Sequence, residues 1–154
     1  MNTNDITNRV KTFEDAVAVL GSDNQSVIDY YAIADKTCAK DILSYAKLRV
    51  IAEALNEGWR PKFDSEEFRY YPWLFLYTKE EYESLDEEQK KECRAVGRFG
   101  RNPSAYGCLA CSYTGCSASY LDSGYNCRLA FKTRELARYC ATQFADILYD
   151  FIFS

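Results

Sequence analysis

Apolar residues recur every three or four positions in three segments of the chain, which is the period of an amphipathic α-helix. The first predicted helix spans residues 12–21, with Thr12 as its N-cap and Gly21 after its last turn. The second spans residues 37–57 and is followed by Gly58, which is typical of the position after a helix end. The third is capped by Thr133 and continues as one helix to the end of the chain. The apolar positions of the last two helices are Cys38, Ile42, Tyr45, Leu48, Ala52 and Leu55, then Leu136, Cys140, Phe144, Ile147 or Leu148, and Phe151.

Two other segments have the features of β-strands. Residues 69–78, RYYPWLFLYT, are rich in aromatic residues, and Pro72 places the start of this strand at an edge or a bulge. In RLAFKT, residues 128–133, Leu129 and Phe131 alternate with polar neighbours as in a half-buried strand. The segment VIDYYAIA, which follows the first helix, fits a helix and a strand equally well.

The charged segment 78–93 completes the pattern. It predicts one short surface helix or two helical turns, with capping boxes at Thr78/Glu81 and Ser84/Glu87. No linker and no repeat divides the chain. The elements therefore predict a single domain, residues 1–154, of the α+β class: a small antiparallel sheet packed against amphipathic helices, ending in a C-terminal helix.

One stretch departs from this ordinary composition. Residues 104–127, SAYGCLACSYTGCSASYLDSGYNC, are rich in Ser, Tyr, Cys and Gly and contain no Lys, Glu, Gln, Met or Trp. Those five types are also missing from the wider window 96–131, and none of them can arise from an AAC or AAT codon whose adenines are randomised. The composition therefore suggests a segment that is diversified at its adenines.

The chemistry of this stretch favours binding over catalysis. Tyr supplies large contact areas with few torsions to order, while Ser, Gly and Asn supply adaptable hydrogen bonds, as in antibody paratopes. Four Cys could suggest zinc, but the second pair is widely spaced and the chain has no His. His-based catalysis is excluded for the same reason, and no base for a Cys nucleophile is evident. We expect no enzyme activity, no metal and no cofactor. The four Cys are Cys108, Cys111, Cys116 and Cys127.

Charge is distributed unevenly along the chain. The net charge of −4 hides an excess of basic residues between positions 93 and 139, with two acidic residues, Asp122 and Glu135, among them. This excess suggests phosphate contacts as an alternative function. The basic residues are Arg94, Arg98, Arg101, Arg128, Lys132, Arg134 and Arg138.

Three segments carry a resemblance: EALNEGWRPKF, YYPWLFLYTKEEYESLDEEQKKECRAVGR and RLAFKTRELARYCATQF. They resemble a family of small uncharacterised proteins encoded by phages and prophages of gut bacteria, over residues 47–154. In that family a variable stretch lies between the flanks GR and RLAFK, here Gly97-Arg98 and residues 128–132. The resemblance implies a segment that varies like the targets of diversity-generating retroelements. Such targets mostly use a C-type-lectin-like scaffold, whereas this chain ends in a helix and is expected to use a different one.

We therefore expect a non-enzymatic phage or mobile-element protein that presents residues 99–126, here called the display segment, to a protein or cell-surface ligand. The alternatives are a nucleic-acid or nucleotide binder that uses the basic residues and stacking tyrosines, and a virion or scaffolding part. No apolar run approaches the ~20 residues of a membrane span, and no signal peptide is evident, so the expected location is the host cytoplasm or the virion. The expected ligand-binding residues are Phe99, Arg101, Asn102, Ser104, Tyr106, Tyr113, Ser117, Ser119, Tyr120, Asp122 and Tyr125.

Overall fold

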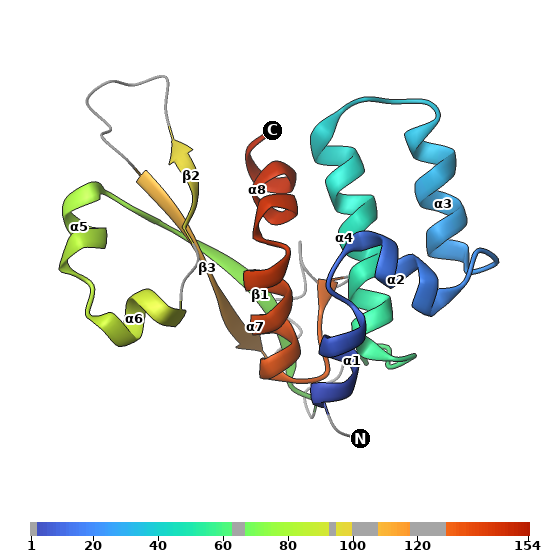
Figure 1. Cartoon of the computed structure of the whole chain (residues 1–154), viewed down its shortest axis with the longest axis horizontal. Coiled ribbons are helices and arrows are strands. Elements are labelled where there is room, and N and C mark those ends of the chain that lie inside the picture. The colour runs from blue at the N-terminus through green and yellow to red at the C-terminus, as the bar shows by residue number, and fades with distance from the viewer. Residues whose placement is uncertain (1–2, 63–66, 93–94, 100–107, 118–128) are drawn as a thin grey trace.

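The computed structural model of the chain describes residues 3–62, 67–92, 95–99, 108–117 and 129–154 (Figure 1). Over these residues the protein is mostly helical. The helices are α1 (Thr3–Arg9), α2 (Phe13–Leu20), α3 (Gln25–Ala34), α4 (Lys40–Asn56), α5 (Lys79–Ser84), α6 (Glu87–Glu92), α7 (Arg134–Gln143) and α8 (Ala145–Phe153).

The prediction of an α+β fold, built as a small antiparallel sheet packed against amphipathic helices, is wrong because helices form most of the structure. The ambiguous segment VIDYYAIA is helical and lies in α3. The predicted strand in RLAFKT is not formed by residues 129–133, where Phe131 makes one isolated bridge to Tyr70. In addition, α1 precedes the first helix that the periodicity revealed.

Three strand segments extend to one side of the helices (Figure 1). They are β1 (Arg69–Tyr77), β2 (Ala95–Phe99) and β3 (Cys108–Ser117), which pair antiparallel in the order β1-β3-β2. Helix α7 lies against β1 and β3. The strands thus adjoin the helical body, and the described hydrophobic core is not organised around them.

Most helix starts follow from hydrogen bonds within four residues of each cap. Thr12 and Asp15 form a capping box at the start of α2, and Thr133 accepts a hydrogen bond from the N–H of Leu136 at the start of α7, as predicted. The predicted box of Thr78 with Glu81 is also present before α5. The predicted box of Ser84 with Glu87 is wrong, because the box before α6 is formed by Asp86 and Gln89.

The ends of two predicted helices differ from expectation. Helix α4 ends at Asn56, and its cap residue Glu57 adopts the left-handed conformation (φ 50°) before Gly58 (φ 84°). The predicted single C-terminal helix is divided at Phe144, whose backbone (φ −109°, ψ 29°) separates α7 from α8. Phe144 is nevertheless buried, so the apolar period passes through the break without interruption.

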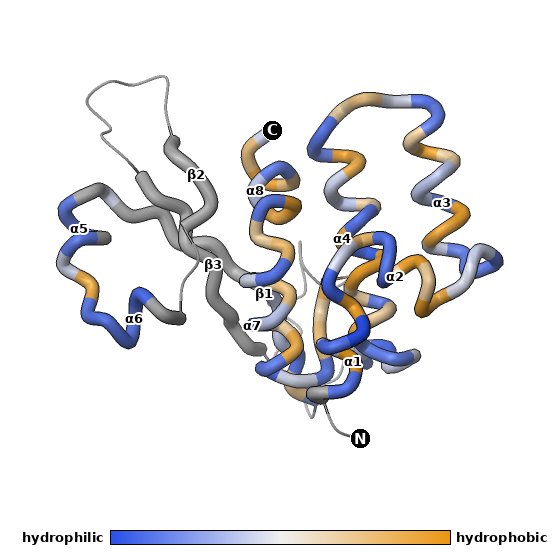
Figure 2. Tube along the Cα trace, viewed as in Figure 1, coloured by the Kyte–Doolittle hydropathy of each residue, from blue (hydrophilic) through white to orange (hydrophobic). Residues whose placement is uncertain are grey.

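Helix α4 lies at the centre of the hydrophobic core and contacts α2, α3, α7 and α8. Hydrophobic positions recur along these helices (Figure 2). The expected burial of Leu129, Phe131, Leu136, Phe144 and Leu148 is confirmed, whereas Ile147 is partly buried. The largest side chains that are fully buried include Ile6, Leu48, Ile51, Leu55, Phe131 and Leu136.

Candidate functional site

Part of the display segment lies in the strands. Phe99 is the last residue of β2, and Tyr113 and Ser117 belong to β3. In the register of the strands, Phe99 is opposite Cys108, Tyr113 is opposite Trp73, and Ser117 is opposite Arg69. The middle of the segment is therefore a paired strand. The other expected ligand-binding residues, which lie outside the described residues, are Arg101, Asn102, Ser104, Tyr106, Ser119, Tyr120, Asp122 and Tyr125.

Strand β3 is paired on both sides. Residues 109–117 pair with β1 over its whole length, and residues 108–111 pair with β2. The pairing with β2 contains an irregularity between Ala95 and Arg98. Of the four Cys considered for zinc, Cys108, Cys111 and Cys116 belong to β3, whereas Cys127 lies outside the described residues.

The chain on both sides of the display segment is attached to the helical core. Before it, Tyr70 exchanges two backbone hydrogen bonds with Phe131, with N···O distances of 3.1 and 2.6 Å. Phe131 is fully buried. The neighbouring Arg69 is also buried, and its guanidinium donates to the carbonyl of Lys62 at 2.6 Å. The start of β1 is thereby joined to the chain that follows the display segment.

Asn56, the last residue of α4, holds the same returning chain. Its Nδ2 donates to the carbonyl of Ala130 at 2.8 Å, and its Oδ1 accepts from the N–H of Lys132 at 3.1 Å. Asn56 is 4% exposed, and its bond to Ala130 is buried while its bond from Lys132 is partly buried. We call the contacts of Asn56 and Tyr70 with residues 130–132 the flank anchor.

Lys132 adds an ionic contact to the flank anchor. Its Nζ lies 3.0 Å from Oε2 of Glu57 and 3.3 Å from the carbonyl of Asn56. A cation at the carbonyl end of α4 also interacts favourably with the helix dipole. Sequence reasoning missed Asn56 and Glu57, because their partners are more than seventy positions away in the chain.

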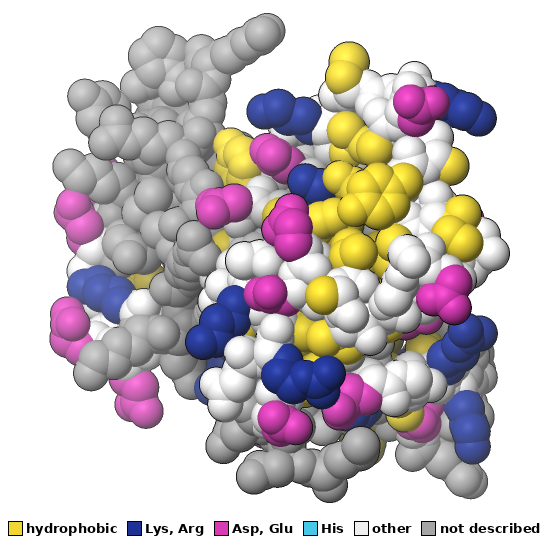
Figure 3. All heavy atoms as spheres, turned by 45° about the vertical axis from the view of Figure 1, so that its right-hand side comes forward, with side chains coloured by type: hydrophobic (Ala, Val, Ile, Leu, Met, Phe, Trp, Pro, Cys, Tyr) yellow, Lys and Arg dark blue, Asp and Glu magenta, His cyan; other side chains and the backbone are white. Residues whose placement is uncertain are grey.

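The predicted basic cluster is only partly described. Arg94, Arg101 and Arg128 lie outside the described residues, and Arg98 belongs to β2. Lys132 is engaged by Glu57 as above. Arg134 and Arg138 are exposed on α7, where Glu135 lies between them in sequence. On the face shown in Figure 3, cationic and anionic side chains are intermixed.

The electrostatics of Glu135 fit this mixture. A hydrogen bond from its own backbone N–H is the main cause that lowers the pKa of Glu135, followed by a bond from the Thr133 hydroxyl. The charges of Arg134 and Arg138 lower it further. Glu135 is thus anionic at neutral pH and offsets part of the positive charge on α7.

A second acidic group, Glu53 on α4, holds the start of α3. Its carboxylate accepts hydrogen bonds from Nδ2 of Asn24 at 2.9 Å and from the hydroxyl of Ser26 at 2.6 Å. Burial raises the pKa of Glu53, but the bonds from Ser26 and Asn24 and the charges of Arg60 and Arg49 outweigh this and lower it. The side chains of Asn24, Ser26 and Glu53 are therefore hydrogen-bonded to one another, and these bonds stabilise the packing of α3 on α4.

The described thiols differ in environment. Cys140 is fully buried in α7, and this burial raises the pKa of its thiol far above the ordinary value. It therefore stays protonated and does not supply a thiolate nucleophile. Cys38 is exposed just before α4. Within the described ranges, no group of three or more Cys, Asp or Glu residues is placed to hold a metal ion.

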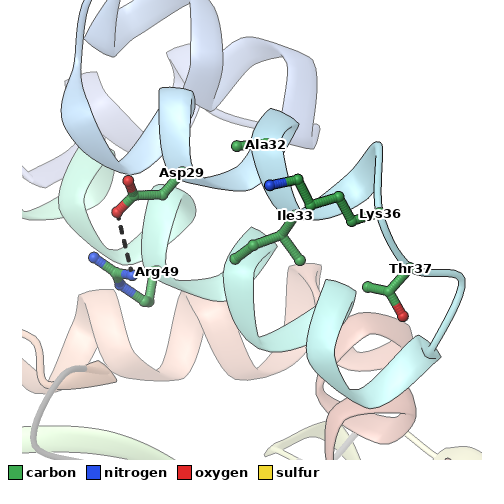
Figure 4. Close-up of a pocket in the computed structure, with 6 residues that line it drawn as sticks. All are labelled: Asp29, Ala32, Ile33, Lys36, Thr37 and Arg49. Atoms are coloured by element: carbon green, nitrogen blue, oxygen red, sulfur yellow. Dashed lines mark ion pairs between the residues drawn. The ribbon is translucent and has the colours of Figure 1, made fainter.

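A groove of about 340 Å³ lies between α3 and α4 (Figure 4). Asp29 and Arg49 form an ion pair across it, with Nη1 and Oδ2 3.7 Å apart. The groove is open to solvent and contains none of the residues expected to bind ligand. It is lined by Asp29, Ala32, Ile33, Lys36, Thr37 and Arg49.

Comparisons of the chain with protein families, with curated proteins and with solved structures give no match. Within the described part of the chain, no helix has the length and apolar character needed to cross a membrane.

Proposed function

We propose that the protein is a non-enzymatic binding protein of a phage or mobile element, and that the display segment is its variable ligand-binding surface. The flank anchor is the observation that supports this proposal best. The chain is tied to the buried helical core at Tyr70 before the segment and at residues 130–132 after it. The chain that follows the segment is thereby held next to the start of β1, the strand that pairs with residues 109–117, and these backbone contacts can persist while the side chains of the segment vary.

The composition of the core supports the same proposal. The described residues of the hydrophobic cluster belong to positions 6–55 and 129–148, which lie on either side of the display segment in the chain. These contacts join residues outside the segment, while β3 lies against α7 at their edge. The helical core would then act as a scaffold that tolerates diversification.

The segment itself has the residue types that an adaptable binding surface requires. Its tyrosines would supply rigid aromatic contacts, and its Ser, Gly and Asn residues would supply hydrogen bonds. The proposed partner is a protein or a cell-surface ligand. The tyrosines are Tyr106, Tyr113, Tyr120 and Tyr125, and the polar residues include Arg101, Asn102 and Asp122.

A segment exchange tests this proposal. Replacing residues 99–126 by a composition-matched sequence should abolish binding to any ligand recovered from cell-surface extracts, while the urea midpoint of the protein stays within error. A control exchanges the charged segment 79–92, which contains none of the expected ligand-binding residues, and should leave binding intact. Loss of the folded state on exchange of 99–126, or unchanged binding after it, would contradict the proposal.

The coding DNA offers an independent test. A nearby near-copy of the codons for residues 96–131, mismatched only at adenines, is expected if the segment is diversified by a retroelement. A locus without such a copy and without a reverse-transcriptase gene would remove the proposed source of variation.

Nucleic-acid binding is the competing function, and salt separates the two. A protein that neutralises six phosphates loses about 10³-fold in affinity between ~50 and ~200 mM salt. A Tyr- and Ser-rich surface should lose far less. The acidic chain, with a pI near 5.0, and the Lys132–Glu57 pair both weigh against the nucleic-acid alternative. Steep salt dependence that survives the exchange of residues 99–126 would favour it instead.

A further inference from the structure

The groove between α3 and α4 brings together charged and apolar side chains that the display segment does not use (Figure 4). Asp29 and Arg49 face each other at one end of the groove, and Thr37 lies toward the other end. Ile33 lies between them and, with Ala32, supplies apolar surface. Its volume of about 340 Å³ lies at the small end of the range for small-molecule sites, about 300–1,000 Å³. The groove is therefore a candidate site for a small ligand.

The guanidinium of Arg49 has hydrogen-bond donors to spare. In its ion pair with Asp29, Nη1 and Oδ2 are 3.7 Å apart, which is beyond hydrogen-bonding distance. Among the described residues Arg49 donates no hydrogen bond, although its side chain is only 28% exposed. A guanidinium presents five N–H donors in a planar fork, and a carboxylate matches this fork with two parallel hydrogen bonds. Arg49 is thus placed to bind a carboxylate that enters the groove.

Asp29 presents the opposite charge beside Arg49. Its Oδ1 accepts a hydrogen bond from Nε2 of Gln25 at 2.8 Å, whereas its Oδ2 is close only to the guanidinium, at 3.7 Å. The side chain of Asp29 is 37% exposed, so its carboxylate is accessible to a ligand. An ammonium group, which has three donors and no acceptor, is a suitable partner for such an oxygen. A site for a carboxylate and a site for an ammonium therefore lie side by side.

The charges around the groove are balanced. Its lining carries two cations, Lys36 and Arg49, and one anion, Asp29. The carboxylate of Glu53 interacts with the charge of Arg49 from the same helix and adds a second anion. Asp35, next to Lys36, is exposed and lies outside the lining. This balance disfavours a simple anion such as phosphate and favours a ligand that carries both signs of charge.

We propose that the groove between α3 and α4 binds a free α-amino acid with an apolar side chain. Its carboxylate would accept hydrogen bonds from Arg49 and interact with the ammonium of Lys36, and its own ammonium would donate to Oδ2 of Asp29. Its side chain would lie on Ile33 and Ala32. An α-amino acid carries its two charges on adjacent groups, which suits a guanidinium and a carboxylate 3.7 Å apart. Because the groove is open and offers few contacts, we expect a dissociation constant on the order of 1 mM.

An NMR titration of the isotope-labelled full-length protein with L-leucine, up to about 20 mM, tests the proposal. The backbone signals of the residues that line the groove should shift and reach saturation. Two matched probes each lack one charged group of the ligand: L-leucinamide has no carboxylate, and isocaproate has no ammonium. Each should bind about tenfold more weakly than L-leucine, because one charged residue of the groove is then left without its partner.

Two variants assign the two charged contacts. Arg49→Gln should remove the preference for L-leucine over L-leucinamide, and Asp29→Asn should remove the preference for L-leucine over isocaproate. The control Arg9→Gln changes an exposed arginine of α1 outside the groove and should bind all three probes like the wild type. Circular dichroism verifies that each variant is folded.

Several results would overturn the proposal. They are a titration with L-leucine that shifts no signal of the groove, equal binding of the three probes by the wild type, and tighter binding of inorganic phosphate than of L-leucine. So would preferences that Arg49→Gln and Asp29→Asn leave unchanged. None of these measurements involves residues 99–126, so their failure is distinct from failure of the proposed function.

Discussion

Replacing Asn56 by Ala measures the strength of the flank anchor. The substitution removes the bond to the Ala130 carbonyl (2.8 Å) and the bond from the Lys132 N–H (3.1 Å) at a position that is 4% exposed. A buried polar group left without a partner costs about 1–3 kcal/mol. Because two backbone groups lose their partner, we expect the free energy of unfolding to fall by about 2–4 kcal/mol.

Urea denaturation followed by circular dichroism provides the assay. With a slope of about 2 kcal/mol/M for a domain of this size, the midpoint should fall by about 1–2 M. The control is Gln25→Ala, which removes an exposed side-chain amide that donates to Asp29 at 2.8 Å. That control should cost less than about 0.5 kcal/mol. If Asn56→Ala costs no more than Gln25→Ala, the returning chain is not held by Asn56 and the flank anchor is refuted.

Three further predictions concern the core, its pH dependence and its thiols. Phe131→Ala should lower the free energy of unfolding by about 3–5 kcal/mol, because Phe131 is fully buried, and a loss below about 1 kcal/mol in urea denaturation would contradict its place in the core. The pKa of Glu53 is lowered in the folded state, so its stabilising effect is present above the unfolded pKa near 4.5 and is lost as pH falls. The stability difference between wild type and Glu53→Gln should therefore shrink from pH ~6 to pH ~3, and a difference that does not change with pH would contradict this assignment. In native protein, iodoacetamide should label Cys38 and leave Cys140 unmodified until urea is added, because Cys140 is buried. Peptide mass mapping measures the labelling, and equal labelling of both residues would show that Cys140 is accessible.

Local features were determined by the sequence alone. Thr12, Thr78 and Thr133 were correctly identified as helix caps, because a capping side chain bonds to a backbone group only three residues away. The apolar period also identified α4 and the buried residues Leu136 and Phe144, since burial of one helix face requires that spacing whatever the partner is.

The same periodicity could not reveal the break at Phe144. The apolar residues keep their spacing across α7 and α8, and the interruption is a change of backbone angles at a buried residue. The class of fold was also beyond local reasoning. The pattern of VIDYYAIA is compatible with a helix and with a strand. In the structure this segment is helical and packs against α4.

The backbone structure of the display segment could not be predicted from its composition. Residues 108–117 form β3 although most of them are small, because strand pairing uses backbone groups that every residue type except Pro provides in full. The sequence also could not identify Asn56 as the partner of the returning chain. Its two hydrogen bonds join positions 74 and 76 residues apart, and only the packing of α4 against residues 129–131 brings them together.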